Sequence, residues 1–334
     1  MEVKKKKHTV RKVLLSILLF IVTFLLVVNV IPPKKVINNN PFIIKEGSRP
    51  LIAAHRGGKN LNPENTFKAM NHSITNYDID ILEMDLCMTS DGYLILNHNE
   101  DINESTDVTT PNYLVREHTL NELQQFNFGY NFKDPVSGEF IYRNLLDNVA
   151  PENKSQVLLE NELRVVTIDE LFNAYATSDL MYIIEIKDSG DLGLRATDTL
   201  VSKIIEYKLE KKVVVGTFHD EVEQHLSKKY PDIMRGASVG AAAKFVITQL
   251  LKVNIFDNSS FVALQIPTSY EIKGITVPLT WKTYINRAHR RNISVQYWTI
   301  NDKKEMKKLI NLGADVIMTD CPDVMYELLI EMGF

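Results

Sequence analysis

Two acids and a histidine interrupt a stretch that is otherwise typical of paired strands. Residues 81 to 100, ILEMDLCMTSDGYLILNHNE, contain two apolar runs on either side of an Asp-Gly turn, and Glu83, Asp85 and His98 lie within them. Burying such groups without partners is costly, whereas a divalent cation would compensate two carboxylates directly. The stretch therefore predicts a metal site. From these residues alone, a solvated hairpin face with the apolar alternates pointing inward is an equal alternative.

The pairing of the two runs decides whether these side chains can meet. If the turn holds two residues, Asp85 lies across from His98, and Glu83 lies across from Glu100. Strand alternation then places all four side chains on one face of the hairpin. A longer turn would shift this register, so the predicted pairing depends on the turn.

Further charged side chains stand near the ends of other strand-like runs. Glu185 and Lys187 share one face of the run MYIIEIK, while His55 and Arg56 end the run LIAAHR. Active sites of parallel barrels lie where the carboxyl ends of the strands meet. Single charges at strand ends are often structural, but their convergence with the hairpin acids on one rim predicts a functional site.

Strand-like and helix-like segments alternate from residue 51 to the end of the chain, which is typical of a mainly parallel sheet with helical crossovers. The predicted strands are 51–55, 81–86, 93–98, 181–187, 212–218, 233–239, 261–266, 294–300 and 315–320. The predicted helices are 64–76, 168–177, 194–209, 219–229, 241–252, 278–291 and 302–312. We expect Asn62 to cap the helix at 64–76, and Asn301 and Gly313 to bound the helix at 302–312.

Nine strands are one too many for a (β/α)8 barrel. The connection between residues 81–86 and 93–98 is too short for a parallel crossover, so these two strands must be antiparallel. The eight remaining strands match a TIM-type (β/α)8 barrel of the α/β class. Residues 130–163 are too long for an ordinary barrel loop and are expected to form an inserted small subdomain over one end.

One N-terminal transmembrane helix is expected to precede the barrel. Residues 13–31 carry no charge and are long enough to span a bilayer. The preceding tail, residues 1–12, is basic, and the positive-inside rule therefore keeps it cytoplasmic. A cleaved signal peptide is the alternative, but the apolar run exceeds a usual signal core and lacks a small-residue cleavage motif. Residues 32–50 are expected to link the anchor to an extracellular catalytic domain, residues 51–334, held at the cell membrane.

The composition fits one barrel-sized domain and argues against a nucleic-acid partner. The chain has 334 residues, 45% of them hydrophobic and 24% charged, which allows one large buried core. The first 35 residues hold 8 of the 38 basic and 1 of the 42 acidic residues, so the remainder carries a net charge of −11. An acidic domain of this kind repels nucleic acid. Cys87 and Cys321 lack metal-ligand spacing and are interpreted as core thiols, with a disulfide as the alternative.

Five blocks of the sequence resemble, in order, the signature motifs of the glycerophosphodiester phosphodiesterase family, a metal-dependent TIM-barrel family. They are HRGGKNLNPENT, EMDLCMTSDGYLILNH, IEIK, WTIN and GADVIMTDCP. The resemblance runs from about residue 51 to about residue 325, and HTLNELQQFNFG and RVVTIDELF resemble the segments that flank the family's inserted region. The order of the blocks makes the resemblance specific, which no single block does.

The resemblance implies a metal site and a catalytic pair. Glu83, Asp85 and Glu185 would bind one divalent ion, Ca²⁺ or Mg²⁺, and His55 and His98 would be the catalytic acid and base. Such a site neutralises an anionic phosphodiester, positions a nucleophile and protonates the departing alkoxide. Imidazole suits the proton transfers because it titrates near neutral pH. Which histidine is the acid stays open.

The resemblance also implies substrate contacts. Arg56 and Lys187 would hold phosphate oxygens, Glu64 would lie at the edge of the site and Trp298 would line the substrate pocket. One position departs from the family, because Asn99 follows the second histidine where an Asp is usual. An amide lacks the charge that raises the basicity of a nearby imidazole, so a lower rate or a shifted pH profile is expected.

Together these implications predict hydrolysis of a glycerophosphodiester to an alcohol and glycerol phosphate near a lipid surface. Lysophospholipids, in a lysophospholipase D-type reaction, and polyglycerol-phosphate polymers are alternative substrates for the same site. Two further alternatives are a catalytically decayed protein that binds lipid headgroups and a phospholipase C that releases a cyclic phosphate. His219, which follows the strand at 212–218, is a weaker candidate for a substrate contact.

Overall fold

The computed structural model describes residues 2–272 and 274–334, and its centre is a closed sheet of parallel strands. These strands are β1 (Leu51–Ala54), β2 (Ile81–Met88), β4 (Met181–Ile186), β5 (Val213–Gly216), β6 (Ala263–Ile266), β9 (Ser294–Tyr297) and β10 (Val316–Thr319). They lie in the order β5-β4-β2-β1-β10-β9-β6, and all adjacent pairs are parallel. Bridges from Arg235 to Val215 and from Gly236 to Ala263 fill the eighth place and close the ring. The predicted TIM-type barrel is confirmed.

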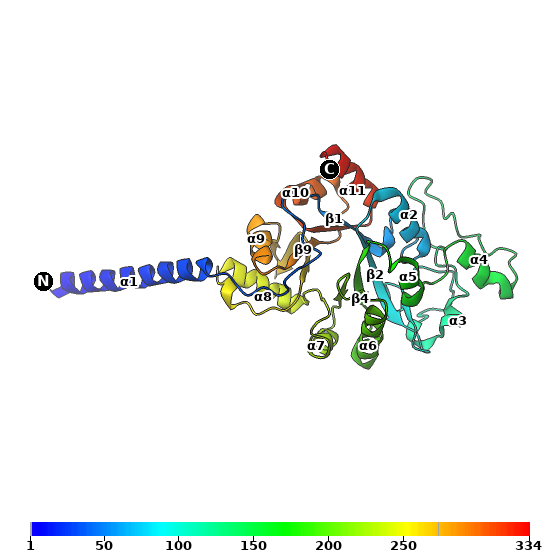
Figure 1. The fold of residues 1–334 in the computed structure, drawn as a ribbon, viewed down its shortest axis with the longest axis horizontal. Coiled ribbons are helices and arrows are strands. Elements are labelled where there is room, and N and C mark those ends of the chain that lie inside the picture. Colours follow the sequence, from blue (N-terminus) through cyan, green and yellow to red (C-terminus); the bar gives the residue numbers. More distant parts are fainter. Residues whose placement is uncertain (1, 273) are drawn as a thin grey trace.

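Helices cover the outside of the barrel (Figure 1). They are α2 (Phe67–Tyr77), α5 (Ile168–Tyr175), α6 (Gly190–Glu206), α7 (Asp220–Lys229), α8 (Val239–Leu250), α9 (Lys282–Arg290), α10 (Lys303–Leu312) and α11 (Pro322–Glu331). Two predicted caps are wrong. Thr66, rather than Asn62, caps α2, and Asp302, rather than Asn301, caps α10, because these side chains accept from the free amides of the first turn. Gly313 ends α10 at a φ of 85°, as expected.

The hairpin strand β3 (Leu94–Leu96) pairs antiparallel with β2, as predicted, but its turn is longer than two residues. A main-chain bond joins Thr89 to Tyr93, and the last of the three residues between them is a glycine at a φ of 87°. The predicted register is therefore wrong by one residue. The main-chain amide of Asn97, rather than that of His98, donates to the carbonyl oxygen of Asp85. The same shift of one residue separates Glu83 from its predicted partner Glu100.

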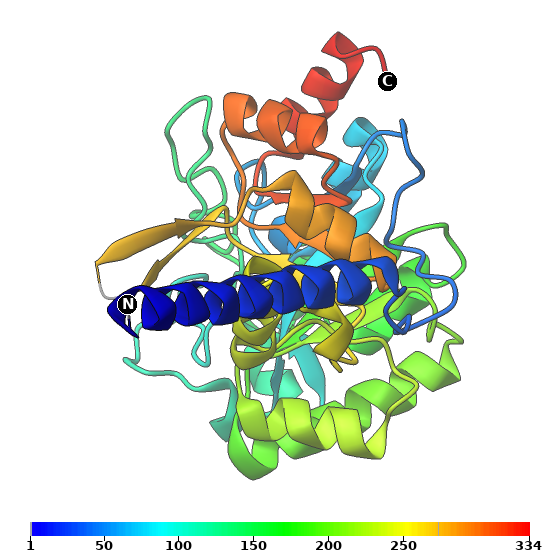
Figure 2. The same ribbon diagram turned by 90° about the vertical axis from the view of Figure 1, so that its left-hand side faces the viewer.

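A second hairpin was not predicted. β7 (Ser269–Ile272) and β8 (Ile275–Pro278) form an antiparallel pair after β6, so α9 begins later than expected. Figure 2 shows this hairpin projecting from the body of the barrel. The strand predicted at 233–239 contributes only the two bridges that close the ring.

Residues 32–50, which we expected to be a linker, run along the end of the barrel where the strands begin. Phe42 is fully buried there and packs into the apolar floor of the barrel with Ile81. Asn40 Nδ2 donates to Val262 O at 2.8 Å, and Ser294 Oγ donates to Phe42 O at 2.8 Å. The stretch therefore closes the barrel opposite to the predicted active-site rim.

Helix α1 (Glu2–Val30) stands away from the barrel, as Figure 1 shows. Within the described residues, its span Thr9–Val30 is the one helix long and apolar enough to cross a membrane, a property that signal sequences share. Its end is tied to the barrel, because Asn29 Nδ2 donates to Lys252 O at 2.8 Å and Arg290 Nη2 donates to Asn29 O at 2.9 Å. The span itself is exposed, which suits a lipid environment.

The region between β3 and β4 is long and mostly irregular. It contains η2 (Val115–Glu117), α3 (Leu120–Leu123), η3 (Pro151–Asn153) and α4 (Lys154–Glu160). Within it, residues 131–133 lie beside Glu64, so this region borders the rim of the barrel. That residues 130–163 form a separate subdomain stays a prediction.

Candidate active site

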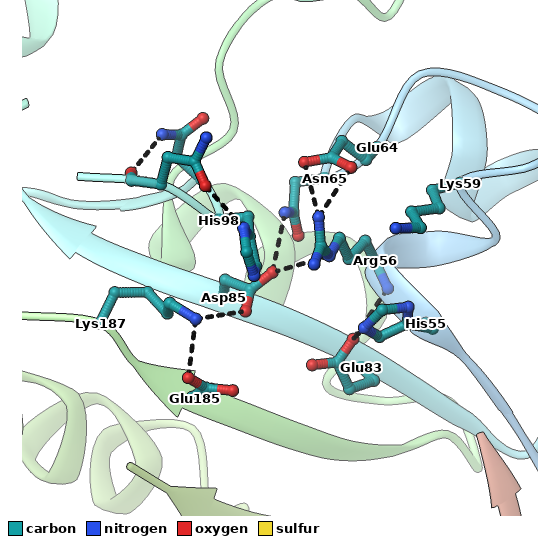
Figure 3. Close-up of polar contacts among 12 residues, drawn as sticks. His55, Arg56, Lys59, Glu64, Asn65, Glu83, Asp85, His98, Glu185 and Lys187 are labelled. Carbon is teal, nitrogen blue, oxygen red and sulfur yellow. Dashed lines mark hydrogen bonds and ion pairs between the residues drawn. The ribbon is translucent and has the colours of Figure 1, made fainter. Parts of the chain in front are cut away.

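A cavity of about 460 Å³ opens at the carboxyl ends of the barrel strands. Eight of the nine candidate site residues line it, namely His55, Arg56, Glu83, Asp85, His98, Glu185, Lys187 and Trp298. Glu64 lies just outside and contacts the site through Arg56. Figure 3 shows how these side chains, apart from Trp298, converge from several strands.

The acids of β2 project into the barrel interior. Alternation along the strand places Glu83 and Asp85 on the same face as Ile81, above the apolar floor. The two acids are only 4% and 2% exposed. Burial, together with the charges of Asp85 and Glu185, raises the pKa of Glu83 to about 8, although His55 opposes this shift. Ionisation of Glu83 inside the barrel is therefore unfavourable without additional positive charge.

Arg56 ties the acids to the loop that carries Glu64. Its main-chain amide donates to Glu83 Oε2 at 2.8 Å, and its Nη1 donates to Glu64 Oε2 at 3.0 Å. Its Nε lies 3.5 Å from Asp85 Oδ2. The residue has a φ of 51°, a left-handed conformation that is uncommon for a side chain of this size. Asn65 supports the arrangement, because its amide nitrogen donates to Asp85 Oδ2 at 3.3 Å.

His55 is held by a carboxylate that the sequence analysis did not assign. Its Nδ1 lies 2.5 Å from Asp320 Oδ1, and its Nε2 lies 3.8 Å from Glu83 Oε2. Asn301 Nδ2 in turn donates to Asp320 Oδ2 at 2.8 Å. Burial lowers the pKa of His55, but Glu83 and Asp320 outweigh it, so the pKa is raised overall. The same contact lowers the pKa of Asp320 against the effect of burial.

A sequence signal for Asp320 existed. It follows β10 as His55 follows β1, and the two strands pair with Ala54 opposite Thr319. Residues that follow paired parallel strands in register must be neighbours. A closed barrel already makes its first and last strands neighbours, so the missing information was the register of β1 and β10.

His98 follows β3 and is held by an amide. Its Nδ1 lies 2.8 Å from Asn99 Oδ1, and Asn99 Nδ2 donates to Glu104 Oε2 at 2.8 Å. The side chain of Asn99 therefore contacts the imidazole. The side chain of Asn99 thus joins the imidazole of His98 to the carboxylate of Glu104.

Lys187 lies between two acids of neighbouring strands. Asp85 and Glu185 are partners in the parallel pairing of β2 and β4. Lys187 Nζ donates to Glu185 Oε1 at 2.8 Å and lies 3.7 Å from Asp85 Oδ1. His219 Nε2 lies 2.9 Å from the carbonyl oxygen of Lys187, so this ring supports the main chain of β4 in the present arrangement. Within residues 2–272 and 274–334, no three acidic, histidine or cysteine side chains are grouped as ligands of one ion.

Trp298 follows β9 and forms the aromatic side of the cavity. Its ring meets that of Phe218 edge to face, with 6.1 Å between the centroids. Cys87 and Cys321 are both free thiols, but only Cys87 is fully buried, so the interpretation as core thiols holds for Cys87 alone.

The barrel and its rim of charged side chains define a TIM-barrel enzyme, a class in which catalytic groups come from the ends of several strands. Residues 55–324 match the model of the glycerophosphoryl diester phosphodiesterase family. The chain therefore belongs to this family of phosphodiester hydrolases.

Similar proteins agree with this assignment. A glycerophosphodiester phosphodiesterase of Caldanaerobacter subterraneus subsp. tengcongensis is 23% identical over 285 residues, which cover 85% of this chain and all of the relative. Lysophospholipase D GDPD1 of Rattus norvegicus is 25% identical and covers 84% of this chain and 86% of its own length. Among solved structures, an Oleispira antarctica phosphodiesterase in complex with the product sn-glycerol-3-phosphate has a TM-score of 0.60 at 19% identity, covering 84% of this chain and 97% of that one.

Proposed function

We propose that the enzyme hydrolyses glycerophosphodiesters to an alcohol and glycerol phosphate with the help of one divalent ion. The observation that carries the proposal is the meeting of two histidines with three acids at one cavity. His55 and His98 each have Nδ1 held by an oxygen acceptor, which leaves Nε2 of each ring for proton exchange. Glu83, Asp85 and Glu185 line the same cavity.

The three acids would hold the ion. Their carboxylate oxygens are the donors that Ca²⁺ and Mg²⁺ prefer. Burial raises the pKa of Glu83 to about 8. A bound cation would lower this pKa by stabilising the ionised carboxylate. The bound ion would neutralise charge on the phosphoryl group and favour attack on phosphorus. The donor set fits Ca²⁺ and Mg²⁺ equally.

The chain's own residues would bind the phosphodiester and move its protons. Arg56 and Lys187 lie on either side of Asp85 and would donate to phosphate oxygens. One histidine would remove the proton of the attacking hydroxyl, and the other would protonate the departing alkoxide. Attack by water gives glycerol phosphate directly, whereas attack by a substrate hydroxyl gives a cyclic phosphate first. Trp298 would pack against the substrate, and Glu64 would keep Arg56 in position.

The proposed site of action is the outer surface of a membrane. The uncharged run at 13–31 would span the bilayer, and the basic tail at 1–12 would keep the N-terminus cytoplasmic. The catalytic domain would then lie outside the cell and beside lipid. Lysophospholipids are a second candidate substrate class, favoured by the exposed apolar wall of the cavity described below. Polyglycerol-phosphate polymers would use the same chemistry.

Turnover of glycerophosphocholine by the full chain tests this proposal. We expect release of glycerol phosphate to stop in EDTA and to return with Ca²⁺ or Mg²⁺. Binding without turnover under either ion would favour a decayed lipid-headgroup protein. A stable cyclic phosphate as the end product would favour a phospholipase C-type reaction instead.

A further inference from the structure

One wall of the active-site cavity is an apolar face of α8. Six residues of this helix line the cavity, namely Val239, Ala242, Ala243, Val246, Ile247 and Leu250. Their spacing of three and four places them on one face of the helix. The adjoining face packs into the barrel, where Phe245 is fully buried, and Ala242 and Val246 at the boundary also contact the core. We call this six-residue face and the space along it the α8 groove.

The α8 groove is open to the surface although large apolar side chains line it. Val239, Ile247 and Leu250 are 50%, 54% and 49% exposed. Tyr270 and Val277, from the hairpin β7–β8, add further apolar surface to the same cavity. A continuous exposed apolar face that runs into an active site marks a binding groove rather than ordinary surface.

The α8 groove leads from the catalytic residues to the C-terminal end of α1, where α1 meets the barrel. The helix starts just after Gly236, which closes the barrel beside the cavity, and its twelve residues rise about 18 Å. It ends at η4 (Asn254–Phe256), which contacts α1. There the rings of Phe24 and Phe256 lie 6.3 Å apart, and Asn29 bonds the carbonyl of Lys252. Figure 1 shows α8 at the point where α1 leaves the barrel.

We propose that the α8 groove is an acyl-chain site and that the enzyme draws single-chain glycerophospholipids from the bilayer that α1 enters. This inference rests on the proposed function and makes its second candidate substrate class, the lysophospholipids, the preferred one. The phosphodiester would meet Arg56 and Lys187 while the chain lies along α8, where burial of methylenes favours binding. The groove face carries no charge that would oppose an acyl chain. A cavity of about 460 Å³ is the size of a site for one small ligand, which favours one chain over two.

A binding experiment tests the acyl-chain site independently of turnover. The chain has two tryptophans, so Trp281→Phe leaves Trp298, in the cavity wall, as the sole reporter. The full chain in phosphatidylcholine vesicles with EDTA is titrated with lysophosphatidylcholine brominated on its acyl chain, which quenches tryptophan on contact. We expect quenching of Trp298. Absence of quenching would overturn the acyl-chain site.

Ala243→Phe is the informative variant. Position 243 is exposed, so the added ring enters the groove rather than the core. We expect it to weaken quenching about tenfold, the effect of roughly two displaced methylenes. Lys244→Phe adds the same ring at a neighbouring exposed position that does not line the cavity, and it should leave quenching unchanged. Equal effects of the two variants would contradict the groove.

Turnover separates this inference from the proposed function. With Ca²⁺ or Mg²⁺ restored, Ala243→Phe should lower kcat/KM for lysophosphatidylcholine about tenfold and leave glycerophosphocholine within about twofold. Equal losses for both substrates would overturn the substrate class while the phosphodiesterase assignment stands. Failure to hydrolyse either substrate would contradict the proposed function and the substrate class together, and the quenching result would then decide the acyl-chain site alone.

Discussion

The imidazole of His55 and the carboxylate of Asp320 are joined at 2.5 Å between Nδ1 and Oδ1 across the first and last strands of the barrel. This contact fixes the orientation of the ring and places a negative charge behind it. The second histidine, His98, has a neutral amide in the corresponding place. The two rings of the proposed acid/base pair therefore differ in electrostatic support, and this difference can be tested.

Asp320→Asn should lower kcat about 10- to 100-fold, the usual effect of losing a partner that orients a functional histidine. The carboxylate raises the pKa of His55, so its loss should lower that pKa and shift the limb of the pH profile that reports His55 toward lower pH. The measurement is kcat/KM against pH. An unchanged profile with a slower rate would mean that Asp320 acts only on structure.

Asn99→Asp should raise the basicity of His98 and shift its limb of the pH profile toward higher pH. Glu104 Oε2 lies 2.8 Å from Asn99 Nδ2, so the new acid would face a second carboxylate. The double variant Asn99→Asp with Glu104→Gln should therefore show the larger gain in rate, and Glu104→Gln alone serves as the control. If all three variants had the activity and pH profile of the unmodified protein, Asn99 would have no effect on the rate.

Replacement of either histidine by Ala should reduce turnover of glycerophosphocholine about 10²- to 10⁴-fold, because each proposed proton transfer would be lost. His98→Ala should change the thermal unfolding temperature little, whereas His55→Ala leaves the buried carboxylate of Asp320 without its partner and should lower that temperature. His219→Ala is the matched control, since this ring bonds only a main-chain carbonyl among the contacts described and should cost less than either catalytic ring. Activity retained in both His55→Ala and His98→Ala would end the assignment.

Divalent ions should stabilise the folded protein. Binding at 100 times Kd contributes about 2.7 kcal/mol to the free energy of unfolding, so Ca²⁺ or Mg²⁺ should raise the unfolding temperature measured in EDTA. Glu83→Gln should abolish this increase and should not destabilise the protein in EDTA, because the amide keeps an acceptor for the main chain of Arg56 and burial already disfavours the ionised carboxylate. Glu64→Gln, outside the group of acids, should keep the response. A response that survives in Glu83→Gln would place the ion elsewhere.

Phe42→Ala should destabilise the barrel without changing its chemistry. The side chain is fully buried at the floor, and removing a buried Phe side chain costs about 3–5 kcal/mol. Unfolding in urea at a temperature where the variant stays folded measures the loss. Phe140→Ala, at a position that is 39% exposed, is the control and should have a much smaller effect. A loss in the control as large as that of Phe42→Ala would argue against a special role of the floor.

Local patterns in the sequence predicted much of the fold of this protein. Alternation of apolar runs and amphipathic segments predicted the eight-membered parallel ring, and the short connection after β2 correctly identified β3 as antiparallel. These features depend on periodicity and connection length, which are local properties of the chain. Most candidate site residues lie within or directly after strands of the barrel, and eight of the nine line the same cavity.

Tertiary structure decided the contacts that depend on register and closure. The partner of His55 is Asp320, 265 positions away, because closing the ring makes β1 and β10 neighbours in register. The turn after β2 took three residues instead of two, and that one residue changed every cross-strand pair of the hairpin. The apolar residues of α8 have the spacing of an ordinary amphipathic helix, and only packing decides which apolar face enters the core and which is left to line the cavity. Such choices are made by surfaces that the chain brings together after its local elements have formed, so they cannot be deduced from any one segment.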